Sequence, residues 1–155
     1  MIGTWIFGVL LALVPCSAAF GQELHVSSSE GKLGETVLIE VSIRSSPEEA
    51  PSVLKWEMIY PAQLLELQPE PESGNAARAS EKLLRCAQHQ TYSYVCILGG
   101  GQKPVQDGPI AIFRFKIRMD AKTGRSAIRI DHIEAITKTL ESVKLTAIEG
   151  QVGIR

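Results

Sequence analysis

The chain has 155 residues, of which 45% are hydrophobic and 21% are charged, and its formal net charge is -1. The 16 basic and 17 acidic side chains nearly balance. This balance argues against nucleic acid or an anionic membrane as a partner, because both recognise a basic surface. Only 13 Gly and 8 Pro are present, without homopolymeric tracts, which excludes a fibrous or disordered chain.

Residues 1–21 have the order of a secretory signal peptide and contain no Asp, Glu, Lys, Arg or His. An apolar run from Trp5 to Val14 is followed by Pro15 and by small residues. About 14 apolar residues are short for a membrane span, which needs about 20. We therefore expect secretion, with cleavage after Ala19 or Gly21.

Two other interpretations of this segment remain open. The stretch that ends at Cys16 resembles a bacterial lipoprotein box, but Pro15 directly before the cysteine matches that box poorly. An uncleaved anchor helix is the other alternative, since the segment carries no basic side chain. We expect an extracellular or periplasmic protein whose mature part, residues 22–155, is one domain without a membrane span.

Two cysteines, Cys86 and Cys96, remain after signal removal, and an even number in an oxidising compartment predicts a disulfide. A spacing of ten residues fits neither a CxxC redox pair nor a zinc-ligand pattern. Two buried, unpaired thiols are the alternative.

The two cysteines flank a predicted β-hairpin. Setting Cys86 opposite Cys96 gives a consistent register, because it also sets Leu84 opposite Leu98 and His89 opposite Ser93. The predicted turn then has three residues, Gln90, Thr91 and Tyr92.

Alternation of apolar and polar residues predicts strands along most of the mature chain. The pattern covers residues 36–44, 53–60, 109–119, 126–130, 143–147 and 152–154. One short helix is expected from Asn75 to Leu84, where alanines favour it. One-sided alternation without long helices predicts an antiparallel β-sandwich of eight or nine strands.

Three stretches of the chain resemble the cohesin-like domain of bacterial secreted proteins. Residues 24–37 resemble its opening strand, glycine turn and second strand, and residues 53–65 resemble its third strand and the corner after it. Residues 96–115 resemble its middle segment, in which a glycine turn leads through Asp107-Gly108 into a long alternating strand. Together the resemblance covers about residues 23–155.

This resemblance implies a jelly-roll-like sandwich of about nine strands. It also implies a binding or assembly role, since cohesins bind dockerin modules in extracellular systems that degrade polysaccharides. The expected partner is another secreted or envelope protein, dockerin-like in kind. The alternatives are a carbohydrate-binding module that holds polysaccharide and a structural subunit of an envelope assembly.

No pattern of catalytic or metal-binding residues stands out. His25, His89 and His132 have no partners at metal-ligand spacing, although Asp131-His132-Ile133-Glu134 would supply half of such a site. No serine lies in a Gly-x-Ser-x-Gly motif. We therefore expect no catalytic site, no metal and no cofactor.

Two tyrosines on the predicted hairpin are the candidate binding residues. Tyr92 and Tyr94 could stack on a sugar or anchor a protein partner. Alternatively, Tyr92 is a turn residue and Tyr94 packs beside the disulfide. The sequence leaves open which face of the hairpin is buried, because Leu84 and Leu98 lie on one side and Val95 and Ile97 on the other.

Overall fold

The computed structural model describes residues 21–155, so the predicted signal peptide over residues 1–21 lies outside the described residues except for Gly21. In residues 21–155 the chain forms strands β1 (Glu23–Val26), β2 (Ser29–Gly31), β3 (Thr36–Arg44), β4 (Val53–Ile59), β5 (Leu65–Leu67), β6 (Glu72–Ser73), β7 (Leu83–Gln90), β8 (Ser93–Gly99), β9 (Gly108–Ile117), β10 (Gly124–Ile136), β11 (Thr146–Ile148) and β12 (Gly150–Ile154). A 3-10 helix, η1 (Pro47–Glu49), and an α-helix, α1 (Asn75–Ala79), interrupt them. The all-β prediction is confirmed, but the strands are not wholly antiparallel, because β1 pairs with β11 and β2 pairs with β12 in parallel.

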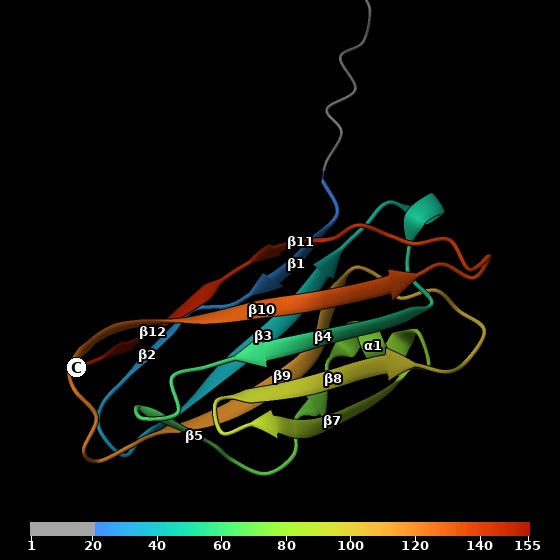
Figure 1. The fold of residues 1–155 in the computed structure, drawn as a ribbon. Coiled ribbons are helices and arrows are strands. Elements are labelled where there is room, and N and C mark those ends of the chain that lie inside the picture. Colours follow the sequence, from blue (N-terminus) through green and yellow to red (C-terminus); the bar gives the residue numbers. More distant parts are fainter. Residues whose placement is uncertain (1–20) are drawn as a thin grey trace, which may run out of the picture.

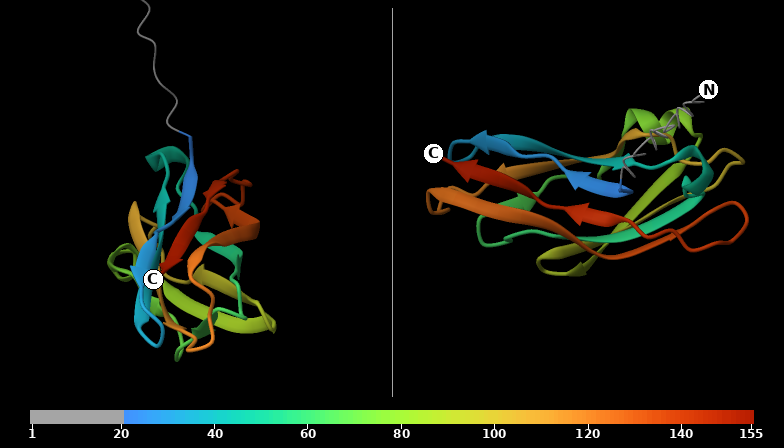
Figure 2. Two further views of the ribbon diagram at one scale, coloured as in Figure 1. Left: turned by 90° about the vertical axis from the view of Figure 1, so that its left-hand side faces the viewer. Right: turned by 90° about the horizontal axis from the view of Figure 1, so that it is seen from above.

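The strands form two sheets that pack face to face (Figures 1 and 2). The back sheet has the order β11-β1-β3-β9-β5, with β6 also paired to β9. The front sheet, which faces the viewer in Figure 1, has the order β2-β12-β10-β4-β8-β7. The described residues thus contain twelve strands, more than the predicted eight or nine, in part because two stretches of chain each contribute to both sheets.

Near each end of the described chain, one stretch crosses from the back sheet to the front sheet. β1 continues as β2 after Ser27 and Ser28, and β11 continues as β12 after Glu149. The two crossings touch at Gly150, where an added Cβ would lie 2.1 Å from the Ser27 carbonyl oxygen. Only glycine therefore fits at this position.

The core lies between the sheets and is built by the alternation that the sequence shows. Trp56 of β4 and Phe113 and Phe115 of β9 are fully buried, together with aliphatic side chains from both sheets. Ala76 and Ala77 bury α1 against the same core, close to β9. The other face of each sheet therefore lies on the outside of the sandwich.

The predicted helix over residues 75–84 is too long. The helix ends at Ala79, and the hydroxyl of Ser80 donates a hydrogen bond to the Ala76 carbonyl oxygen at 2.6 Å. Glu81 then adopts a φ of 58°, which a right-handed helix cannot continue. Strand β7 begins at Leu83, two residues later.

The hairpin of β7 and β8 confirms one part of the predicted register and contradicts another. Cys86 lies opposite Cys96, and Leu84 lies opposite Leu98, as expected. However, Gln90 rather than His89 faces Ser93, so the turn is Thr91-Tyr92. The cause is a shift in register between Gln88 and Gln90, which gives β7 an extra residue at His89.

Candidate functional site

The outer face of the front sheet is the candidate functional site, and we call it the Glu57 face after its central residue. Directly opposed residues in neighbouring strands project from the same face of a sheet. Four rows across β10, β4, β8 and β7 make up the Glu57 face: Arg129, Ile59, Ser93 and Gln90; Asp131, Glu57, Val95 and Ala87; Glu134, Lys55, Ile97 and Arg85; and Ile136, Val53, Gly99 and Leu83.

Glu57 lies in the middle strand of this face and is only 7% exposed. Three side chains from three different strands contact its carboxylate. His89 Nδ1 of β7 lies 2.8 Å from Oε1, and the Ser93 hydroxyl of β8 donates to the same oxygen at 2.7 Å. His132 Nδ1 of β10 lies 2.9 Å from Oε2. The carboxylate therefore joins β7, β8, β4 and β10 on their outer side.

Both histidines reach Glu57 because their strands depart from regular pairing. β10 has one extra residue between Asp131 and Glu134 where it pairs with β4, and His132 within this bulge has a φ of 48°. The backbone N–H of His132 donates to the Asp131 carboxylate at 2.9 Å, which stabilises the bulge. His89 lies at the corresponding irregularity of β7. Bulges commonly redirect a side chain in this way.

The contacts around Glu57 determine its charge. Hydrogen bonds from His89 and Ser93, helped by His132, lower the pKa of the Glu57 carboxyl group to about 2, although burial opposes them. A carboxylate with so low a pKa is a poor general base near neutral pH. Each imidazole directs Nδ1 at Glu57, and no hydrogen bond of either Nε2 atom is found within residues 21–155, so Nε2 can contact water or a partner.

Apolar side chains lie exposed on the same face, beside the polar cluster. Ile97 of β8 is 45% exposed, Leu83 of β7 is 64% exposed and Ile136 of β10 is 36% exposed. Val53 and Val95 are half-buried beside them. Apolar side chains on a rigid sheet face, with charged groups beside them, are typical of a surface that binds another macromolecule.

The structure separates the predicted binding tyrosines. Tyr92 is exposed in the turn of the hairpin, whereas Tyr94 is half-buried and packs against the core, with its ring centroid 6.4 Å from that of Tyr60. The two cysteines form a disulfide with their Cα atoms 4.1 Å apart. Cys96 is fully buried, so the bond lies on the inner side of the hairpin.

Sequence reasoning missed Glu57 and its partners as a cluster. Glu57 stands 32 residues from His89 and 75 residues from His132. The sequence did place the Glu57 carboxylate on the polar side of a predicted strand. It could not predict that β-bulges would bring two histidines into contact with that carboxylate.

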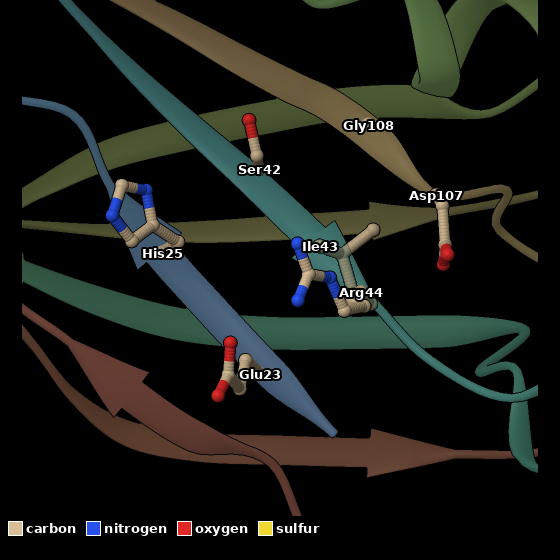
Figure 3. A pocket seen from close by; sticks show the side chains of 7 residues that line it. All are labelled: Glu23, His25, Ser42, Ile43, Arg44, Asp107 and Gly108. Carbon is tan, nitrogen blue, oxygen red and sulfur yellow. The ribbon is translucent and has the colours of Figure 1, made fainter. Parts of the chain in front are cut away.

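A hollow lies on the outer side of the back sheet (Figure 3). Glu23 and His25 of β1 and Ser42 and Arg44 of β3 line it, and Asp107 borders it at the start of β9. Asp107 accepts a hydrogen bond from the backbone N–H of Ser45 at 2.8 Å, which fixes the loop there. The hollow is open and its groups are not aimed at a common point (Figure 3).

Neither a metal cluster nor a membrane-spanning helix is found in the part of the chain that the structure describes. Within residues 21–155, no three or more His, Cys, Asp or Glu side chains are arranged to hold a metal ion. The same residues contain no helix that is long and apolar enough to cross a membrane.

Comparisons with known proteins identify the architecture. The sixth cohesin of Acetivibrio cellulolyticus scaffoldin B, solved in complex with a Cel5 dockerin mutant, superposes with a TM-score of 0.78 at 18% identity, over 87% of this chain and 99% of that chain. A non-cellulosomal cohesin from the archaeon Archaeoglobus fulgidus gives a TM-score of 0.75 at 17% identity, over 87% and 91%. The chain has the cohesin fold.

A third cohesin is similar over the same extent. The OlpA cohesin of Clostridium thermocellum, solved in complex with the dockerin Doc918, gives a TM-score of 0.78 at 14% identity, over 87% of this chain and 99% of that chain. No family model matches the sequence. No curated protein matches it either. The cohesin resemblance is therefore carried by topology, and the sequence-based prediction of this fold is confirmed.

Proposed function

We propose that this domain is a secreted, non-catalytic interaction module that uses its Glu57 face to bind a dockerin-like protein. The observation that carries the proposal is the likeness to cohesins solved in complex with dockerins, which extends over nearly the whole of those domains. Fold alone does not determine function, so the surface itself must support the proposal.

The Glu57 face has the composition expected of a protein-binding surface. Its exposed aliphatic side chains, Ile97, Leu83 and Ile136, supply apolar area. Arg85 and Arg129 supply positive charge at two of its sides. Strands held by backbone pairing and by the Glu57 contacts need little ordering on binding, which favours affinity.

The chemistry of the Glu57 cluster favours binding over catalysis. All three donors satisfy the carboxylate, and its low pKa makes it a weak proton acceptor near neutral pH. The Cys86–Cys96 bond agrees with export to an oxidising compartment. Sugar binding to a flat sheet relies on exposed aromatic rings, and in the described part of the chain Tyr92 is the one aromatic among the exposed large hydrophobic side chains.

A pull-down with the mature domain, residues 22–155, tests the proposal. Culture supernatant and envelope fractions supply the candidate partners, and a glycan array is probed in parallel. We expect one secreted or envelope protein to be enriched and no glycan to bind. Binding to polysaccharide without an enriched protein would instead identify a carbohydrate-binding module.

A further inference from the structure

Two imidazoles contact one buried carboxylate, so this group of three side chains gains two positive charges when both imidazoles are protonated. His89 and His132 both place Nδ1 within 2.9 Å of Glu57, on separate oxygens. Their side chains are 54% and 74% exposed, so protons can reach both rings from solvent. Histidine is the side chain that ordinarily changes charge between about pH 5 and 8.

Glu57 can stay ionised while the histidines take up protons. The hydrogen bond from Ser93 persists in either state, since a hydroxyl donor does not titrate in this range. The low pKa of Glu57 places its own protonation in much more acidic medium. A protonated imidazole beside an ionised carboxylate forms a stronger, charge-assisted hydrogen bond, so proton uptake tightens the cluster.

The neighbouring charges determine the sign of the effect. Lys55 and Glu57 face the cluster from β4, Arg85 from β7, and Arg129, Asp131 and Glu134 from β10, while β8 contributes only the uncharged Ser93, Val95 and Ile97. With neutral histidines, three cations balance three anions. Lys55 is already paired to Glu134 at 3.5 Å, whereas neither arginine has an ion-pair partner within residues 21–155.

We propose that His89 and His132 take up protons in mildly acidic medium while Glu57 stays ionised, so that the Glu57 face gains positive charge and binds an acidic partner surface more tightly. This inference rests on the proposed function, since it describes how binding at that face is regulated. The outward Nε2 atoms change from acceptors to donors at the same time, which adds hydrogen bonds to carboxylates of the partner.

An immobilised poly-L-glutamate surface tests this charge switch without knowledge of the natural partner. Binding of the mature domain is compared at about pH 8 and about pH 5.5 at fixed ionic strength, because histidine charge differs between these conditions. The wild type should bind about fivefold or more tightly at the lower pH. The double variant His89→Asn/His132→Asn should lose most of this change.

His25→Asn is the matched control, because it removes an exposed histidine from the opposite sheet (Figure 3). It should keep the wild-type pH dependence. A loss in the control of about half that in the double variant, or more, would overturn the proposal, since the effect would then follow the number of histidines removed and so the net charge. Wild-type binding that does not change with pH would overturn it as well. Circular dichroism verifies that each variant is folded.

The poly-L-glutamate test and the pull-down can give independent results, so failure of the charge switch can be told from failure of the proposed function. Capture of a partner without a pH response on poly-L-glutamate would support the proposed function and contradict the charge switch. A pH response without capture of any protein would support the charge switch and contradict the dockerin-like function.

Discussion

The hydroxyl of Ser93 donates a 2.7 Å hydrogen bond to the Glu57 carboxylate on the neighbouring strand, and both side chains are buried on the outer face of a sheet. Ser93 is 0% exposed and also accepts a hydrogen bond from the backbone N–H of Gln90 at 3.2 Å. One residue thus closes the β7–β8 hairpin and supports the charged centre of the candidate interface.

Replacing Ser93 with Ala should lower the free energy of unfolding by about 1–3 kcal/mol, because the buried carboxylate loses a donor. Urea denaturation at neutral pH measures the change. Ser126→Ala, a half-buried serine of β10 outside this cluster, should change stability by less than about 0.5 kcal/mol. Equal effects of the two variants would show that Ser93 makes no special contribution.

The pH dependence of stability should contain a contribution from Glu57. Its pKa is lowered from 4.5 to about 2 in the folded protein, so the ionised form is the stabilised one. This contribution is fully present above about pH 5 and is lost as the pH falls toward 2. Chemical denaturation over this range should show a steeper loss for the wild type than for Glu57→Gln.

Glu66→Gln serves as the control for that titration, because Glu66 is an exposed carboxylate on β5. Its stability should follow the wild-type curve. If Glu57→Gln also followed that curve, the contacts from His89 and Ser93 would not stabilise the ionised carboxylate.

Loss of the disulfide should lower stability while leaving the fold in place. Replacing Cys86 and Cys96 together with Ser should cost about 2–4 kcal/mol. Trp56 is the single tryptophan of residues 22–155 and pairs with Cys96 in the sheet, so its fluorescence should rise when a reductant removes the quenching disulfide. Two reactive thiols in the exported, undenatured protein would contradict the bond, and a denatured sample is the control for buried thiols.

The close contact between the β1–β2 and β11–β12 segments, which each cross from one sheet to the other, depends on Gly150. Gly150→Ala would place a Cβ 2.1 Å from the Ser27 carbonyl oxygen, a backbone atom that cannot move aside alone. We expect a loss of about 3 kcal/mol or more, measured by thermal or urea unfolding. Gly99→Ala is the control, since its nearest neighbour outside the adjacent residues lies 3.7 Å away, and it should cost less than about 1 kcal/mol.

Local patterns in the sequence predicted much of the sandwich. Alternation located β3 over residues 36–44, and the pairing of Cys86 with Cys96 followed from their positions on one hairpin. Such features depend on neighbours that are close in the chain. The extent of the helix did not follow, because Glu81 adopts a left-handed conformation that helix propensity does not indicate.

The candidate site depends on two β-bulges, which the alternation of apolar and polar residues does not predict. A strict two-residue period places His89 opposite Ser93, whereas the bulge redirects its ring to Glu57. His132 reaches the same carboxylate through a second bulge, 75 residues along the chain from Glu57. Irregular pairing between distant strands arises from tertiary packing, so no local pattern could place the three residues together.

The most direct test of the proposed interface compares Ile97→Asp with Leu38→Asp. Both replace an exposed aliphatic residue of a sheet, but Ile97, 45% exposed, lies on the Glu57 face and Leu38, 54% exposed, lies on the back sheet. The measurement is the affinity of each variant for the protein captured by the wild-type domain. We predict that Ile97→Asp weakens binding by about tenfold or more and that Leu38→Asp leaves it unchanged. Equal affinities of Ile97→Asp and the wild type, or loss of binding in Leu38→Asp alone, would contradict the assignment of the interface to the Glu57 face.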